Sequence, residues 1–340
     1  MSASPSSDRP PRPRLDVDEL RSRASTASGR DVHRPHELPG GASSLTFLAH
    51  WTENGDDPLV LKVAPPGVAP VRNRDVLRQA RILRALAGTP AIPVPRVLFE
   101  DSGNPPESPP LFGMSFVPGE SLEPHIDPDV VLPSAADITG RARDAAEALA
   151  ALHRVTPSAV GLGDEPAGTL ADEVDRWARL FATAPPELSE GADHVAERLA
   201  ASVPAALPAT LLHGDYRLGN TLCEAGSLRA VIDWEIWSVG DPRIDVAWFL
   251  LTADPSAHPS AVRKAPGMPG PDALLEAYRD AGGPGTTGLD WFRALVLYKL
   301  AAASALIAKN AARRGDPGGF GARAARQLPD MIARARAAIG

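Results

Sequence analysis

Asp215, Asn220 and Asp233 carry the side-chain types that phosphoryl transfer requires. Asp215 and Asn220 are five residues apart, and Asp233 follows the next apolar run. Transfer to a hydroxyl needs a carboxylate that orients the hydroxyl and accepts its proton. It also needs hard oxygen ligands that hold Mg²⁺ against the phosphates. We therefore expect Asp215 to be the base and Asn220 and Asp233 to bind the metal.

The spacing of these residues is that of a protein-kinase catalytic loop, in which the base Asp precedes a metal-binding Asn by five residues. Asp233 ends an apolar strand, as the metal-binding Asp of protein kinases does. By itself, either Asp215 or Asn220 would indicate only a residue that forms a turn, because both residue types are common in turns. The combination of His213-Gly-Asp, Asn220 and Ile-Asp-Trp-Glu, each after its own strand, favours a catalytic site.

The sequence positions these residues with a strand-rich segment followed by a helical one. Alternating apolar residues predict the strands, and Asn54-Gly55 marks a hairpin between two of them. Pro118 and Gly119 end this segment, and amphipathic helices then dominate. The predicted elements are strands over 44–51, 59–63 and 111–117, helices over 15–28, 75–87, 141–155, 169–181, 271–281, 290–312 and 322–338, and a strand–loop–strand hairpin over 211–234.

This order of elements predicts an α+β protein with two lobes. A small β-rich N-terminal lobe over 15–117 is expected to bind nucleotide. A larger, mainly helical C-terminal lobe over 118–340 is expected to carry the catalytic residues and bind the acceptor. Residues 1–14 are rich in Ser, Pro and Arg and are expected to form a disordered tail.

Three motifs of the C-terminal lobe resemble the aminoglycoside phosphotransferase and choline kinase-like family. They are HGDYRLGN from His213, VIDWE from Val231 and GDPRIDVAWFL from Gly240. The resemblance is greatest to the branch of kinase domains fused to some acyl-CoA dehydrogenases. It covers roughly residues 39–314, with highly specific motifs in the C-terminal lobe and weaker ones in the N-terminal lobe. The resemblance implies a bilobal protein-kinase-like fold and phosphotransferase activity.

The resemblance also implies roles for individual residues. Asp215 would be the catalytic base, Asn220 and Asp233 the magnesium ligands, and Lys62 the strand lysine that pairs with the phosphates. His213 would support the catalytic loop. The remaining implied positions are Gly40, Gly41, Ser43 and Ser44 in the loop covering the nucleotide, Ser115, Phe116 and Val117 beside adenine, Glu235 near the metal or substrate, and Asp241 and Asp245 as supporting or helix-capping carboxylates.

One position departs from the kinase pattern. Kinases pair the strand lysine with a glutamate on the following helix, and Gln79 stands at the expected place. A glutamine can hydrogen-bond Lys62 but brings no charge. The departure concerns the strength of that pairing and leaves the predicted fold unchanged.

Two basic features have alternative interpretations. Lys299 lies in a helix that is apolar on most sides, so it either has an acidic partner or a ligand, or extends its ammonium to solvent. A group near the C-terminus either receives an anionic substrate or forms a solvated helix face. Its members are Arg313, Arg314, Arg323 and Arg326.

Composition excludes several classes of protein. The net charge of −7 does not indicate a nucleic-acid-binding surface. The single cysteine, Cys223, permits no intrachain disulfide and suits a reducing cytoplasm. No uninterrupted apolar run reaches membrane-spanning length, and the N-terminus lacks the apolar core of a secretory signal. We expect neither nucleic acid nor membrane as partner, and a monomer or homodimer.

The sequence thus predicts a kinase that uses Mg²⁺ and ATP or GTP to phosphorylate a hydroxyl of a small molecule. The acceptor could be a hydroxyacyl-CoA or hydroxy acid, an aminoglycoside or other antibiotic, or a sugar or secondary-metabolite hydroxyl. A pseudokinase or nucleotide-dependent binding protein is the alternative, supported only by Gln79. A protein kinase is disfavoured, because Gly240-Asp241-Pro242 follows Asp233 almost at once and leaves little room for an activation loop.

Overall fold

The computed structural model describes residues 15–39, 43–53, 57–315 and 319–339. The chain divides into two compact units, Met1–Ala87 with Pro95–Phe116 and Gly88–Val94 with Val117–Gly340. The sequence assigned 88–94 and Val117 to the N-terminal lobe, whereas both belong to the second unit. A backbone hydrogen bond of 2.8 Å from the Val231 N–H to the Pro93 carbonyl oxygen ties 88–94 to this unit. The expected N-terminal tail and the positions of Gly40 and Gly41 lie outside the described residues.

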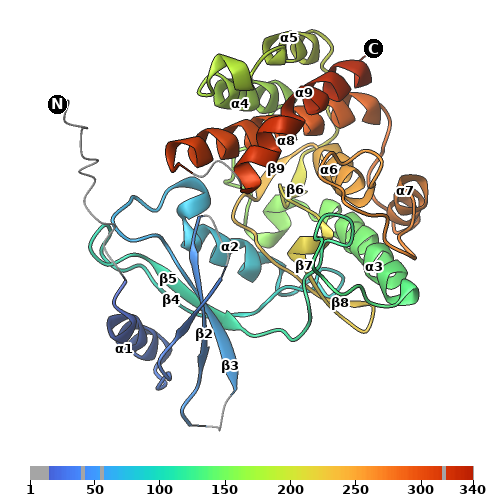
Figure 1. Ribbon diagram of the computed structural model, residues 1–340. Helices are drawn as coiled ribbons and strands as arrows, with labels where there is room; N and C mark the ends of the chain where they lie inside the picture. The colour runs from blue at the N-terminus through green and yellow to red at the C-terminus, as the bar shows by residue number, and fades with distance from the viewer. Residues whose placement is uncertain (1–14, 40–42, 54–56, 316–318, 340) are drawn as a thin grey trace, which may run out of the picture. The chain divides into compact units, whose positions relative to one another are not determined.

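The first unit is built on a five-stranded antiparallel sheet in the order β1-β2-β3-β5-β4 (Figure 1). Buried and partly exposed side chains alternate along β3, as the sequence pattern predicts. In the register of the sheet, Lys62 on β3 lies opposite Thr46 on β2 and Phe112 on β5. The strands are β1 (His36–Leu38), β2 (Leu45–His50), β3 (Pro58–Val63), β4 (Val97–Asp101) and β5 (Leu111–Ser115).

Two helices pack on this sheet. In α1 (Val17–Ser28), Leu20 and Ala24 join the apolar core formed by β2, β3 and neighbouring segments. The carboxylate of Asp16 accepts the first free N–H groups of α1, and Gly29 ends the helix in the left-handed conformation. The second helix, α2 (Val76–Leu86), contacts β4 and β5.

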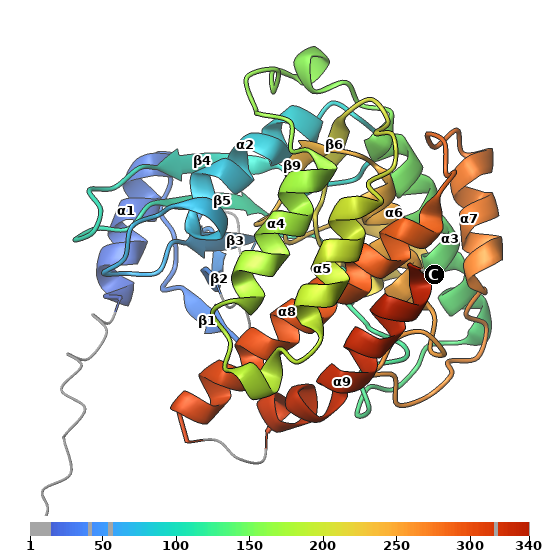
Figure 2. The ribbon, with the colours of Figure 1, turned by 90° about the horizontal axis from the view of Figure 1, so that it is seen from above.

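The second unit is mainly helical. Helices α4, α5, α8 and α9 lie side by side (Figure 2). The helices of this unit are α3 (Ala135–His153), α4 (Leu170–Phe181), α5 (Ala192–Ala201), α6 (Arg243–Ala253), α7 (Pro271–Asp280), α8 (Leu289–Arg313) and α9 (Phe320–Ala338). Short strands between α5 and α6 carry the site residues: β6 (Thr210–Leu212), β7 (Thr221–Glu224), β8 (Ser227–Val231) and β9 (Ser238–Gly240).

The predicted hairpin over 211–234 is wrong in its pairing. Strand β6 pairs with β9, and β7 pairs with β8, so two separate ladders flank the site. The sequence also missed α5 and α6. Every residue of α6 is buried, so it has no polar face to produce the helical period that sequence reasoning detects.

Helix α8 has an unexpected property. Among the described helices, it alone has the length and mean hydropathy, 1.4, of a membrane span. Because 72% of that apolar stretch is buried inside the protein, α8 occupies the position of a core helix.

A buried ion pair fixes the start of α6. Asp241 and Arg243 lie 2.6 Å apart, with side chains 2% and 4% exposed. Arg243 also donates to the carbonyl oxygens of Ala205 at 2.7 Å and Thr287 at 2.9 Å. The guanidinium lies over the ring of Phe292, 4.4 Å from its centroid. Arg243 therefore ties α6 to the chain before β6 and to α8.

We expect Arg243→Ala to destabilise the protein by about 3–5 kcal/mol, because it leaves the Asp241 carboxylate buried without its counter-ion. The urea midpoint of unfolding would fall accordingly. The matched control is Arg293→Ala, which removes an exposed ion pair with Asp290 and should leave the midpoint nearly unchanged. Equal midpoints for Arg243→Ala and the wild type would contradict the assignment.

Candidate active site

The catalytic-loop residues follow β6 directly. His213, Gly214 and Asp215 lead from β6 into a short 3-10 turn, Leu218–Asn220, which β7 continues. Gly214 has φ +85°, and a Cβ at this position would lie 2.5 Å from the Ile236 carbonyl oxygen. Only glycine fits there, because other residues would be strained and would clash. This tight turn brings Asp215 to the surface of the unit.

Asp245, in the first turn of α6, holds the loop by its backbone. Its carboxylate accepts the N–H of His213 at 2.6 Å and the N–H of Gly214 at 3.0 Å. Burial opposes the charge of Asp245, but His153, His213 and Lys299 outweigh it and lower the pKa below the ordinary 3.8. His153 Nε2 lies 3.7 Å from Asp245 Oδ2, which is too long for a hydrogen bond.

The Asp215 carboxylate is oriented by three donors. Trp248 Nε1 donates to Oδ1 at 2.8 Å. Asn220 Nδ2 donates to Oδ2 at 2.9 Å, and Arg217 Nε donates to the same oxygen at 3.2 Å. Asp215 is only partly buried, so its carboxylate remains accessible. A carboxylate fixed in this way can orient an incoming hydroxyl.

His213 links the catalytic loop to the strand that precedes Asp233. The N–H of Asp215 donates to His213 Nδ1 at 3.2 Å, which makes Nδ1 the acceptor. His213 Nε2 then carries the proton and donates to the Ile232 carbonyl oxygen at 2.9 Å. The buried ring packs against Trp234, with centroids 4.6 Å apart. These contacts suit the supporting role that the resemblance implied, which stays a prediction.

The two expected metal ligands are brought together by the backbone. The N–H of Ile232, next to Asp233, donates to the Asn220 carbonyl oxygen at 2.9 Å. Asp233 has φ 64°, the left-handed conformation that Asp tolerates better than most residues. Such strained backbone concentrates at functional sites.

The donor set fits a magnesium ion that arrives with phosphates. Asn220 uses Nδ2 twice, toward the carbonyl and the carboxylate of Asp215. Its Oδ1 has no donor among the described residues and is available as a hard ligand. The described part of the chain holds no cluster of three or more His, Cys, Asp or Glu side chains suited to a metal. Asn220 and Asp233 alone would therefore bind Mg²⁺ weakly without phosphate oxygens.

The first unit holds the expected phosphate-binding lysine. Lys62 Nζ donates to Ser44 Oγ at 3.4 Å. Ser43 and Ser44 are both buried. Gln79 on α2 is 3% exposed, and its Nε2 has no hydrogen-bond partner among the described residues. A buried amide without a partner is unusual and needs an explanation.

The expected adenine-side and metal-side residues lie at chain connections. Phe116 is 42% exposed directly after β5, and Val117 begins the next part of the second unit. Ser115 Oγ accepts the Arg96 N–H at 2.9 Å. Glu235 is partly buried in the turn after Asp233.

Lys299 is buried beneath the catalytic loop and does not extend to solvent. Its ammonium donates to the Gly214 carbonyl oxygen and lies 4.2 Å from the ring centroid of Trp248. Burial lowers the pKa of Lys299, although Asp215, Asp245 and Glu173 partly offset this effect. The structure thus shows a buried Lys299 that contacts a backbone carbonyl and an aromatic ring, and its role in binding a ligand stays a prediction.

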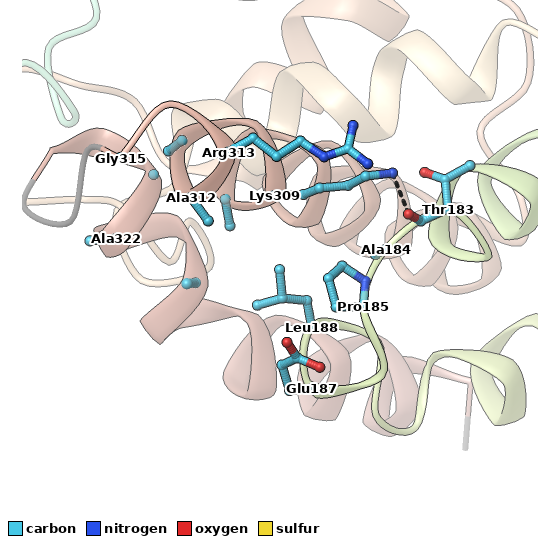
Figure 3. A pocket seen from close by; sticks show the side chains of 14 residues that line it. Thr183, Ala184, Pro185, Glu187, Leu188, Lys309, Ala312, Arg313, Gly315 and Ala322 are labelled. Atoms are coloured by element: carbon cyan, nitrogen blue, oxygen red, sulfur yellow. Dashed lines mark hydrogen bonds between the residues drawn. The ribbon is translucent and has the colours of Figure 1, made fainter. Parts of the chain in front are cut away.

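Arg313 lines a pocket of about 890 Å³ between α8, α9 and the chain after α4 (Figure 3). Six of its fourteen lining residues are alanines, and Pro185 and Leu188 project into it. Lys309 donates to the Thr183 carbonyl oxygen. No partner of the Arg313 guanidinium is found in the described part of the chain. Arg314, Arg323 and Arg326 are exposed and are not among the residues that line the pocket.

Sequence reasoning missed three contributors to the site: Arg217, Trp248 and Glu123. Arg217 and Trp248 stand inside the motifs that carried the resemblance, but their residue types assigned them no role. Glu123 lies far from the catalytic loop in sequence, and no sequence signal connects it with Arg217. Its carboxylate accepts from Arg217 Nη1 at 2.6 Å and from the Gly219 N–H at 2.8 Å.

A profile of the phosphotransferase enzyme family matches residues 35–295. The chain belongs to this family. Among its curated relatives, acyl-CoA dehydrogenase family member 11 of Homo sapiens is 26% identical, over 77% of this chain and 34% of that protein. Family member 10 of Mus musculus is 28% identical, over 62% of this chain and 20% of that protein. This phosphotransferase chain thus spans about a third or less of the length of these relatives.

Solved structures show the fold of this family member. A candidate aminoglycoside phosphotransferase of Ralstonia eutropha has a TM-score of 0.76 at 21% identity and covers 96% of this chain and 98% of its own. The expected α+β, bilobal protein-kinase-like fold is thereby confirmed, with a β-rich first unit and a mainly helical second unit. The expected relation to the acyl-CoA dehydrogenase-associated branch is confirmed as well.

We expect Asp245→Asn to destabilise the phosphotransferase by about 1–3 kcal/mol at pH 7, because an NH₂ group would face a backbone N–H. The folded-state pKa of Asp245 lies below 3.8, so its ionised form favours folding above that pH. This contribution is lost as the pH falls through the lowered pKa. Urea unfolding of both proteins between pH 7 and pH 3 should show the difference shrinking toward acid.

Asp129→Asn, on an exposed loop, serves as the control for Asp245→Asn and should follow the wild type at every pH. A constant difference between Asp245→Asn and the wild type across the range would contradict the role given to the Asp245 charge.

Proposed function

We propose that this phosphotransferase is a kinase that transfers the γ-phosphoryl group of ATP or GTP to a hydroxyl of a small molecule. The observation that carries the proposal is the convergence of Asp215, Asn220 and Asp233 on one side of the second unit. Asn220 bonds to Asp215 through its side chain and to Ile232, next to Asp233, through its backbone. Such an arrangement supplies a base and two oxygen ligands in one place.

Asp215 orients the acceptor hydroxyl and takes its proton. The acceptor oxygen forms a bond to the γ-phosphorus as the bond from that phosphorus to the bridging oxygen of the nucleoside diphosphate breaks. Lys62 binds the nucleotide phosphates in this proposal. Bound Mg²⁺ would neutralise charge on the phosphate oxygens, with Asn220 and Asp233 as its protein ligands.

The pocket at Arg313 supports an acceptor that is long and anionic. Arg313 follows Lys299 by fourteen residues in α8, which corresponds to about 21 Å along the helix. The two side chains leave nearly the same face of the helix. Lys299 contacts Gly214 beside the base. An acceptor that contacts both Arg313 and Asp215 would have to be longer than a small hydroxy acid, as an extended acyl thioester with phosphate groups is.

We therefore rank a hydroxyacyl-CoA as the first candidate acceptor. The relatives named as acyl-CoA dehydrogenases support this class. An antibiotic is the second candidate, because a thermostable mutant of aminoglycoside phosphotransferase APH(4)-Ia, solved with AMP-PNP and hygromycin B, shares the fold with a TM-score of 0.59 at 17% identity. A cationic antibiotic would not be attracted by Arg313 and Lys309. A short hydroxy acid, a sugar or a secondary metabolite would use only the part of the site beside Asp215.

A nucleotide-dependent binding protein without phosphotransfer is the alternative function. Its support is Gln79, which replaces the charged partner expected for Lys62 and leaves Nε2 without a partner among the described residues. The complete set of Asp215, Asn220 and Asp233 favours the kinase.

We expect Asp215→Asn to abolish phosphoryl transfer while nucleotide binding persists. An amide cannot accept the hydroxyl proton, so kcat should fall by at least about a hundredfold. The assay combines ATP or GTP with Mg²⁺ and a panel of hydroxyacyl-CoAs, hydroxy acids and aminoglycosides, and detects product by mass spectrometry. Transfer at the wild-type rate in Asp215→Asn would refute the assignment. Nucleotide binding without product from any acceptor would favour the binding protein.

We expect Arg313→Gln to raise KM for a hydroxyacyl-CoA about fivefold, since an exposed ion pair contributes up to about 1 kcal/mol. For the matching free hydroxy acid, KM should not change, because the short acceptor does not reach the pocket. Arg314→Gln, which alters the neighbouring exposed arginine outside the pocket, is the control. An equal effect of Arg313→Gln on both acceptors would remove the pocket from the acceptor site.

A further inference from the structure

Arg217 joins the predicted base to a second, buried carboxylate. Its Nε lies 3.2 Å from Asp215 Oδ2, and its Nη1 lies 2.6 Å from Glu123 Oε1. The side chain of Glu123 is 13% exposed. Burial raises the pKa of Glu123, and Arg217 opposes that rise. Burial also works against the charge of Arg217, but the two carboxylates outweigh it and raise its pKa further. Arg217 is therefore always charged.

The backbone around this pair is shaped to hold it. Glu123 Oε1 also accepts the N–H of Gly219 at 2.8 Å. A Cβ at Gly219 would lie 2.6 Å from that same oxygen, so a larger residue would displace the carboxylate. Ser121 Oγ donates to the Gly219 carbonyl oxygen. The segment carrying Glu123 is thus fastened to both the N–H and the carbonyl oxygen of Gly219, next to the ion pair.

Most of the donor capacity of Arg217 is unused. A guanidinium has five N–H groups, and the structure shows hydrogen bonds from Nε to Asp215 and from Nη1 to Glu123. For the other N–H groups, no partner is found among the described residues, and the side chain is 31% exposed. His258 also faces Arg217, but burial and the guanidinium lower its pKa to about 4, so it is neutral at pH 7.

We propose that Arg217 is a catalytic residue that donates to the phosphoryl group as it passes to the acceptor, and that Glu123 is the positioning residue that aims it. The proposal rests on the phosphotransferase function given above. Charge on the phosphoryl oxygens must be stabilised during transfer, and a preorganised guanidinium is suited to this. A merely structural arginine would have its N–H groups occupied by protein acceptors, as those of Arg243 are.

The test compares a neutral pair with the wild type. Arg217→Gln alone would leave Glu123 buried without its counter-ion, so Arg217→Gln is combined with Glu123→Gln. We expect kcat to fall about 100–1,000-fold, as for loss of one oxyanion donor, with the nucleotide KM within about threefold because the donor acts in the transition state. Single Glu123→Gln keeps an acceptor oxygen and should lose less. In Arg217→Ala combined with Glu123→Gln, added guanidinium should restore part of kcat and sodium should not.

The control is Arg229→Gln on β8, which removes an exposed arginine paired with Glu224 and should keep the wild-type kcat. Unchanged kcat in the neutral pair, or a loss confined to the acceptor KM, would overturn the proposal. If the neutral pair fails to fold by circular dichroism, single Arg217→Gln replaces it, and a wild-type kcat there has the same meaning. Nucleotide hydrolysis without acceptor provides a second readout. If Asp215→Asn is inactive while the Arg217 variant keeps the wild-type kcat, this inference is refuted and the proposed function stands. If the wild type itself transfers no phosphoryl group to any acceptor, the proposed function is refuted.

Discussion

The site depends on one buried carboxylate that binds two consecutive backbone N–H groups. Asp245 is fully buried, and it accepts from His213 at 2.6 Å and from Gly214 at 3.0 Å. A charge in such a place is tolerated only when it is fully hydrogen-bonded and compensated. Because Asp245 belongs to α6, the position of the catalytic loop follows the position of that helix. The Asp241–Arg243 pair at the start of α6 therefore acts on the site from a distance.

Around Asp245, the interior of the second unit holds other polar groups that are paired with one another. Lys299 donates to the Gly214 carbonyl oxygen, while Asp245 accepts the Gly214 N–H, so both sides of this residue are fixed. His153 Nδ1 contacts the Tyr278 hydroxyl at 2.8 Å, which links α3 with α7 beside Asp245. Low local dielectric strengthens these interactions and penalises any missing partner. The network thus holds the loop rigid, as transfer to an oriented hydroxyl requires.

A second set of contacts holds the end of the catalytic loop that lies away from Asp245. Ser121 donates a hydrogen bond to the carbonyl oxygen of Gly219, and the Glu123 carboxylate accepts one from the N–H of Gly219. Asp245 thus holds the start of the catalytic loop by hydrogen bonds, and Ser121 and Glu123 hold its end. Arg217 and Asp215 lie between these two attachments, and this arrangement explains how a surface loop can keep a guanidinium and a carboxylate in a fixed relation.

The sequence by itself determined the element types over most of the chain and the residues around Asp215, Asn220 and Asp233. These are local properties: apolar periodicity, turn residues and short motifs survive in the order of the chain. Only the tertiary structure decided the pairing of β6 with β9, the existence of the fully buried α6, and the contacts of Glu123 and Lys299 with the catalytic loop. Glu123 and Gly219 are ninety-six residues apart, and no single-sequence pattern encodes such a meeting. It arises because buried charges and backbone groups must find partners, and the partners are chosen by packing.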